Sequence, residues 1–435
     1  MNTKKLDTLL IGAALFAMFF GAGNLIFPTA IGLESGNKWI FSLLGFISTG
    51  IGLPVLGIIA VAKSGGTIDL LTSRVHPLFS TVISSVIILA IGPLLAIPRT
   101  CATVFEIGIQ PLFKNSSPIL ISIVYFSITL FFVIKPSGVI DKIGKILTPI
   151  LLFVISAIII KGILQPIGTP VITNVSMPFS LGFTTGYQTL DALGSIVMAG
   201  ILLMTLVEKG YTNKNEQVKM TIIAGLIAGL GLLIVYSGLL YLGACSSEIY
   251  PLSTGKTELI INITSAIFGN LGQISLCIVI SAACLTTAIG LTAVVGNYFS
   301  NLSGNKISYK FIVIVTSIFS AFMSINGVDE IIKLAIPMLV LVYPIIIVLI
   351  ILGIVDQFIK NSNVYKGAVL GAFIVGVMDS ISAMGIHVEI LQNINKFLPF
   401  SSSGFSWILP ASILGLLGLL LPPKNDHVFD YSNSN

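Results

Sequence analysis

About twelve long apolar stretches follow one another along this 435-residue chain, in which only 9% of the residues are charged. A helix needs roughly 20 apolar residues to cross the ~30 Å hydrocarbon layer of a bilayer. Soluble domains carry about 25% charged residues, so lipid rather than water surrounds most of this chain. We therefore predict an all-α polytopic membrane protein. The expected spans are residues 8–33, 39–62, 78–109, 118–134, 143–164, 182–206, 218–243, 269–299, 309–325, 331–353, 364–384 and 405–421.

Composition also excludes several function classes. The net charge of +5 is small and the basic residues are scattered, so nucleic acid is not an expected partner. The spans show neither a metal-ligand cluster nor a nucleophile with its base, so we expect no enzyme and no cofactor. The bilayer is the expected surrounding, and no obligate protein partner is evident. Free thiols are expected at Cys101, Cys245, Cys277 and Cys284, which lack metal-site spacing.

The basic residues also set the direction of the spans. With the N-terminus inside, most lysines and arginines of the loops face the cytoplasm, beginning with Lys4, Lys5, Lys63 and Arg74. Because positive charge accumulates on the cytoplasmic side of membrane proteins, we predict that both termini are cytoplasmic.

The first span contains a segment poorly suited to a continuous helix. Gly21, Ala22, Gly23 and Asn24 stand in its middle, and glycine and asparagine disfavour helix interiors. Interrupted backbone is tolerated at that depth only where it lines a cavity or holds a ligand, as in the substrate sites of secondary transporters. Alternatively, the two glycines only allow a neighbouring helix to approach.

The chain also contains a faint internal duplication. The pattern Ile-x-Lys-x-x-x-Pro occurs in residues 143–149, at the start of the fifth span, and again in residues 331–337, at the start of the tenth. An odd number of spans per repeat places the second copy upside down in the membrane. We therefore predict a 5+5 inverted repeat with two added spans. Its expected boundaries are 1–164, 165–353 and 354–423, followed by a short tail at 424–435.

The duplication predicts that the sixth span is broken like the first. Gly186, Tyr187, Gln188 and Thr189 form a polar stretch there, where lipid-facing leucine would be expected. Paired interruptions in matching spans are the best sequence indication of a transport site. Amides from Ala22 onward would suit the carboxylate of a zwitterionic amino acid. Carbonyls near Phe20 and in residues 186–189 would suit an ammonium or sodium, and Tyr187 or Gln188 could close the site.

Other candidate groups lie in the third, sixth and eighth spans. Arg99, Glu106 and Asp191 are ionisable within apolar spans, so each is either a coupling group or part of a structural ion pair. Thr286 and Thr287 share a helical face with Ala283 and could supply oxygens to a hard cation. Alternatively, their hydroxyls only bond back to their own helix.

Four motifs follow one another along the chain, in residues 20–28, 92–100, 186–192 and 284–291. Together and in this order they resemble the bacterial branched-chain amino acid carriers of the amino acid–polyamine–cation superfamily. The resemblance covers nearly the whole chain. It implies the leucine-transporter fold and uptake of leucine, isoleucine and valine by symport with sodium or, in some members, protons.

The first motif also looks like that of the neurotransmitter–sodium symporters, with one residue fewer before Phe27. This likeness implies a sodium site made by carbonyls of Ala17, Phe20 and Ala283 and the hydroxyls of Thr286 and Thr287. Asn24 matches a residue that serves a second sodium in those symporters, whose other ligands have no match here.

The expected function is therefore a sodium-coupled symporter in the bacterial inner membrane. In the nearest alternative the same fold is coupled to protons, with Asp191 or Glu106 titrating. A channel is a further alternative, although channels usually lack interrupted spans within one chain.

Overall fold

The computed structural model describes residues 3–134, 139–359, 361–386 and 388–422, and within them the regular structure is helical. The α-helices are α1 (Thr3–Phe19), α2 (Gly23–Ser35), α3 (Trp39–Ile47), α4 (Leu53–Lys63), α5 (Ile68–Ser73), α6 (Pro77–Leu89), α7 (Ala96–Thr103), α8 (Pro118–Ile134), α9 (Val139–Leu164), α10 (Pro178–Gly186), α11 (Asp191–Glu208), α12 (Lys214–Cys245), α13 (Lys256–Leu302), α14 (Tyr309–Ser324), α15 (Val328–Ile354), α16 (Asn363–Ala383), α17 (Glu389–Phe397) and α18 (Ile408–Leu420). Short 3₁₀ or π segments join several of them, namely η1 (Gly36–Lys38), η2 (Ser48–Gly52), η3 (Ala90–Leu94), η4 (Val104–Ile109), η5 (Tyr187–Thr189), η6 (Ser246–Glu248), η7 (Asp356–Phe358) and η8 (Ser401–Ser403).

The all-helical expectation is confirmed, since each expected span falls on helical chain. Seven helical stretches among the described residues are long and apolar enough to cross a membrane alone, and shorter apolar helices include α8, α14 and α18. The first expected span is divided into α1 and α2, and the sixth is divided into α10, η5 and α11. Both predicted breaks are therefore present.

Helix α13 differs from the expectation for the eighth span. It begins at Lys256 and bends at Gly269, whose φ of 58° lies in the left-handed region that glycine adopts readily. The expected span starts at this bend, and the helix over residues 256–268 was not predicted. The charged residues Lys256 and Glu258 interrupt its apolar pattern, so the sequence did not indicate a membrane helix there.

Spatial contacts divide the chain into two compact units. The first comprises Met1–Val55, Val86–Ser195 and Lys219–Ile336, and the second comprises Leu56–Ser85, Ile196–Val218 and Pro337–Asn435. These units are defined by which residues lie close together in space and do not test the internal duplication. The repeat boundaries at 164 and 353 therefore stay a prediction. Within the first copy of the duplicated pattern, the side chains of 143–148 lie outside the described residues, as does the expected tail 424–435.

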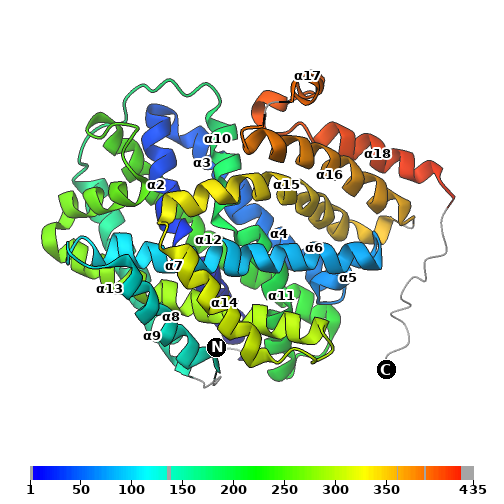
Figure 1. Ribbon diagram of the computed structural model, residues 1–435, viewed down its shortest axis with the longest axis horizontal. Coiled ribbons are helices and arrows are strands. Elements are labelled where there is room, and N and C mark those ends of the chain that lie inside the picture. The colour runs from blue at the N-terminus through cyan, green and yellow to red at the C-terminus, as the bar shows by residue number, and fades with distance from the viewer. Residues whose placement is uncertain (1–2, 135–138, 360, 387, 423–435) are drawn as a thin grey trace. The chain divides into compact units, whose positions relative to one another are not determined.

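In the second unit, α16 and α18 run side by side (Figure 1). Polar contacts join the chain before α6 to the chain after α15: Arg74 Nη2 lies 2.9 Å from Asp356 Oδ1, which also accepts a 2.7 Å hydrogen bond from Tyr365. Arg74 follows α5, Asp356 lies in η7 and Tyr365 lies in the first turn of α16, so these side chains tie together the ends of several helices.

In the first unit, glycines allow α3 to pack directly on α10, the helix that leads to the second break (Figure 1). A Cβ on Gly45 would overlap the carbonyl oxygen of Phe179, and a Cβ on Gly182 would overlap that of Ser42. Small residues let membrane helices approach closely where no hydrophobic effect drives association. The close approach positions the end of α10.

Candidate functional site

The first break occupies Phe20, Gly21 and Ala22, between α1 and α2. The Asn24 side chain stabilises it, because Oδ1 accepts a 3.0 Å hydrogen bond from the Gly21 amide. The backbone N–H of Asn24 donates to the Gly21 carbonyl at 3.1 Å, and the backbone N–H of Leu25 donates to the Ala22 carbonyl at 3.4 Å. The earliest amides of a helix have no acceptor within it, which leaves those of Ala22 and Gly23 as the candidates for an anion.

The second break follows α10, where η5 gives way to α11. Leu190 has a φ of 67°, a left-handed conformation that is costly for a branched side chain. The Thr189 hydroxyl donates to the Gly186 carbonyl at 2.9 Å, and the Leu190 amide donates to the Tyr187 carbonyl at 3.1 Å. The break is thus a defined turn rather than loose chain.

A buried hydrogen-bond network joins the two breaks. Asn24 Nδ2 donates to Asp191 Oδ2 at 2.6 Å and also to the Tyr236 hydroxyl. Tyr236 in α12 donates to the same carboxylate oxygen at 3.2 Å. Asn24, Asp191 and Tyr236 are 1%, 6% and 0% exposed, so the network lies out of reach of solvent. It connects the first, sixth and seventh spans.

Sequence reasoning missed Tyr236. A tyrosine in an apolar span needs a partner for its hydroxyl, and that signal could have pointed to it. Its ring is fixed edge-on against Phe46, with centroids 5.0 Å apart.

Arg99 reaches from α7 to the second break. Its Nη1 donates to the Gln188 carbonyl at 2.5 Å, and its Nη2 donates to the Thr189 carbonyl at 3.4 Å. With the bonds inside the turn, each carbonyl of residues 186–189 therefore receives a donor from the protein. Each of these carbonyls keeps a second lone pair beside the printed donor, so their expected role in binding an ammonium or sodium stays a prediction.

The other residues expected around the substrate have mainly local contacts. Tyr187 is buried and its ring meets that of Phe183 edge-on at 5.6 Å. Gly186 packs against Thr49, whose hydroxyl donates to the Phe183 carbonyl at 2.9 Å. Gln188 is half-buried, and its buried Oε1 has no hydrogen-bond partner within the described parts of the chain.

The residues expected around sodium lie in α1, the first break and α13. The hydroxyls of Thr286 and Thr287 both donate to the Ala283 carbonyl, at 2.9 and 3.0 Å. This is the back-bonded arrangement of threonines in membrane helices, and it leaves the hydroxyl lone pairs available as cation ligands. Ala17 is half-buried in the last turns of α1, and Phe20 is buried in the break.

Glu106 contacts the start of α15, whereas Arg99 and Asp191 make their contacts at the two breaks. Its Oε1 accepts a 2.8 Å hydrogen bond from the Val328 amide at the start of α15. A carboxylate at a helix N-terminus is favourable because it satisfies an otherwise unpaired amide and complements the helix dipole.

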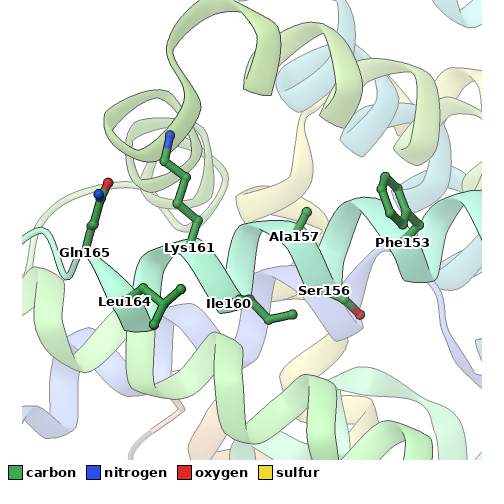
Figure 2. Close-up of a pocket in the computed structure, with 7 residues that line it drawn as sticks. All are labelled: Phe153, Ser156, Ala157, Ile160, Lys161, Leu164 and Gln165. Atoms are coloured by element: carbon green, nitrogen blue, oxygen red, sulfur yellow. The ribbon is translucent and has the colours of Figure 1, made fainter.

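A groove of 440 Å³ lies elsewhere, along α9 (Figure 2). Its lining residues are Phe153, Ser156, Ala157, Ile160, Lys161, Leu164 and Gln165, none of which belongs to either break. Lys161 Nζ lies 4.3 Å from the centre of the Phe268 ring, a cation–π contact. The groove is a feature of the apolar outer face of this helix.

Two mid-span breaks joined by buried polar side chains are typical of the leucine-transporter fold. Solved structures support this fold. The chain superimposes on MhsT in complex with L-phenylalanine with a TM-score of 0.57 at 17% identity, covering 94% of this chain and 98% of MhsT. The superposition on inward-facing Mhp1 has a TM-score of 0.61 at 13% identity and covers 95% of this chain and 90% of Mhp1. The superposition on a Na⁺-coupled sialic acid symporter has a TM-score of 0.60 at 15% identity and covers 96% of this chain and 90% of that symporter.

The chain belongs to the branched-chain amino acid transport protein family, whose model matches residues 4–425. The branched-chain amino acid permeases BraB and BrnQ of Bacillus subtilis are 38% and 39% identical to it; 95% of this chain is covered in each case, with 95% of BraB and 96% of BrnQ. The branched-chain amino acid transport system 2 carrier protein of Pseudomonas aeruginosa is 36% identical, with 96% of this chain and 97% of that protein covered. The resemblance found in the motifs is confirmed, and the chain is a multi-pass membrane transporter rather than an enzyme.

Proposed function

We propose that this transporter imports leucine, isoleucine and valine by symport with sodium across the bacterial inner membrane, with both termini in the cytoplasm. The observation that carries the proposal is the Asn24–Asp191 hydrogen bond, which brings the two breaks together in the interior. The relatives at 36–39% identity are permeases and carriers of branched-chain amino acids, which supports the substrate class.

The amino acid would lie beside the two breaks. The amides of Ala22 and Gly23 begin α2, so they and the positive end of its dipole favour the substrate carboxylate. The aliphatic side chain would enter an apolar pocket formed by the first, third, sixth and eighth spans. A pocket of this kind selects leucine, isoleucine and valine by size with few polar contacts.

Sodium would bind between the first and eighth spans. The proposed ligands are the carbonyls of Ala17, Phe20 and Ala283 and the hydroxyls of Thr286 and Thr287. The alignment of both hydroxyls on the Ala283 carbonyl supports this set, because it directs them to one side of α13. Coupling requires that sodium bind one conformation of the transporter more tightly than the other.

Proton coupling through Asp191 is the second candidate. The observation that favours it is the burial of this carboxylate between Asn24 and Tyr236, since a carboxyl group at such a position could carry a proton through the transport cycle. Glu106 is less suited to this role, because it caps α15.

Leucine uptake into proteoliposomes, with sodium and pH gradients imposed separately, tests the proposal. We expect saturable uphill accumulation driven by a sodium gradient at equal pH on both sides. Accumulation driven only by a pH gradient would favour the proton-coupled candidate. Leucine flux that never exceeds equilibration would indicate a channel and would overturn symport.

A further inference from the structure

Arg99 is a buried cation that faces both breaks. Its side chain is 6% exposed, and its Nη atoms bond the carbonyls that end the second break. The start of α2 also lies close by: a Cβ placed on Gly23 would be 3.0 Å from Arg99 Nη2, the nitrogen that donates to the Thr189 carbonyl. The guanidinium thus lies close to both half-helix ends.

Phe27 fixes the guanidinium in this position. Its ring centre lies 5.5 Å from Arg99 Cζ, and its Cε2 would be 3.0 Å from a Cβ on Gly23. Glycine at position 23 therefore permits the guanidinium and the ring to approach the first turn of α2 together. A planar guanidinium has several N–H donors, so it can bind carbonyls on one side and a carboxylate on the other.

The charges near Arg99 suit a zwitterion. Asp191 lies within electrostatic range of Arg99, and Asn24 and Tyr236 both donate to its Oδ2 rather than to Oδ1. An amino acid adds one charge of each sign, so it leaves the net charge of this interior unchanged. A solute with a single charge would leave that charge uncompensated in a medium where this is costly.

Space is present beside these groups. A Cβ on Gly194, which is buried one turn after Asp191, would meet no atom within 4 Å. A Cβ on Gly21 would meet only Asn24 Oδ1, at 3.7 Å. Gln188 Oε1, for which the described residues supply no hydrogen-bond partner, adds a polar atom on the segment that Arg99 contacts.

We propose that Arg99 binds the α-carboxylate of the transported amino acid, together with the first amides of α2. This inference rests on the proposed function and adds to it a side-chain ligand for the substrate. Arginine suits the role because its planar fork matches the two oxygens of a carboxylate.

The test compares leucine with leucinamide, which keeps the ammonium and the aliphatic chain but has a neutral amide instead of the carboxylate. Binding to the purified full-length transporter in detergent is measured by competition with radiolabelled leucine, or by thermal shift where a variant binds weakly. We expect Arg99→Gln to weaken leucine binding roughly 10- to 100-fold and leucinamide binding less than about 3-fold. Equal losses for both ligands would show that Arg99 only supports the break, and would overturn the proposal.

Two further variants keep the test decisive. If Arg99→Gln does not fold, Arg99→Lys keeps the charge but loses the fork, and it should reduce the preference for leucine over leucinamide; an unchanged preference would overturn the proposal. Lys161→Gln is the matched control, since it removes a cation of the same unit from the α9 groove (Figure 2) and should change neither affinity. Failure of the native protein to bind leucine would instead contradict the proposed function.

Discussion

Asn24 Nδ2 donates a 2.6 Å hydrogen bond to Asp191 Oδ2, across 167 residues of sequence and between two interrupted spans. Asn24 lies in the first turn after one break, and Asp191 is the first residue of the helix after the other. Each break exposes backbone that is costly in a membrane interior, and the contact places the two together. The candidate site therefore depends on this pair.

Replacing Asn24 by alanine should impair both stability and transport. The change removes the acceptor of the Gly21 amide and a donor to a buried carboxylate, a loss of about 2–3 kcal/mol in the free energy of unfolding. Thermal denaturation in detergent and leucine uptake measure the two effects. Asn326→Ala is the control, since that exposed side chain bonds the nearby Met323 carbonyl. Equal behaviour of the two variants would contradict the role of Asn24.

Replacing Tyr236 by phenylalanine should remove the hydroxyl and keep the ring contact with Phe46. The lost hydrogen bond to Asp191 is expected to cost about 1.5–3 kcal/mol of stability and to slow leucine uptake. Tyr309→Phe is the matched control, because its hydroxyl bonds a carbonyl, that of Val133, at 3.2 Å. Uptake reduced to the same extent in both variants would argue against a specific role for Tyr236.

Replacing Thr286 by alanine should weaken sodium binding. We expect the sodium concentration for half-maximal leucine uptake to rise at least ~10-fold, while uptake at saturating sodium is retained. Thr129→Ala is the control, since its hydroxyl bonds back to the Tyr125 carbonyl at 2.9 Å in the same manner. A sodium dependence like that of the native protein would remove Thr286 from the ion site.

Replacing Glu106 by glutamine should leave the pH dependence of uptake unchanged, because an amide oxygen can still accept from the Val328 amide. Glu106→Ala removes this cap and should lower stability by about 1 kcal/mol. Uptake into proteoliposomes at several external pH values, with melting curves for both variants, checks the prediction. Loss of proton-driven uptake in the glutamine variant, with its melting curve unchanged, would identify Glu106 as a coupling group.

Replacing Gly45 by alanine should separate α3 from α10. The new methyl group would overlap the Phe179 carbonyl, and we expect a destabilisation of about 1–3 kcal/mol, measured by thermal denaturation. Gly290→Ala is the control, since a Cβ at that exposed position meets no atom within 4 Å. A melting temperature unchanged by Gly45→Ala would mean that the helices repack without loss.

Local features of the chain made most of the fold predictable. Apolar stretches of bilayer length identified the helices, and the glycines at positions 21 and 23 and the polar residues 186–189 located both breaks. These signals lie within a few residues of the structure that they specify. The helix over residues 256–268 was missed because charged residues interrupt its apolar pattern.

The amino-acid sequence by itself determined that this protein is a bundle of membrane helices with two of them broken, because backbone cost and apolar length are properties of short segments. Only the tertiary structure decided that Tyr236 joins Asn24 and Asp191, and that Arg99 takes the carbonyls of Gln188 and Thr189. Partners this far apart in the chain are selected by which helices pack together and in which register, and no short segment carries that information.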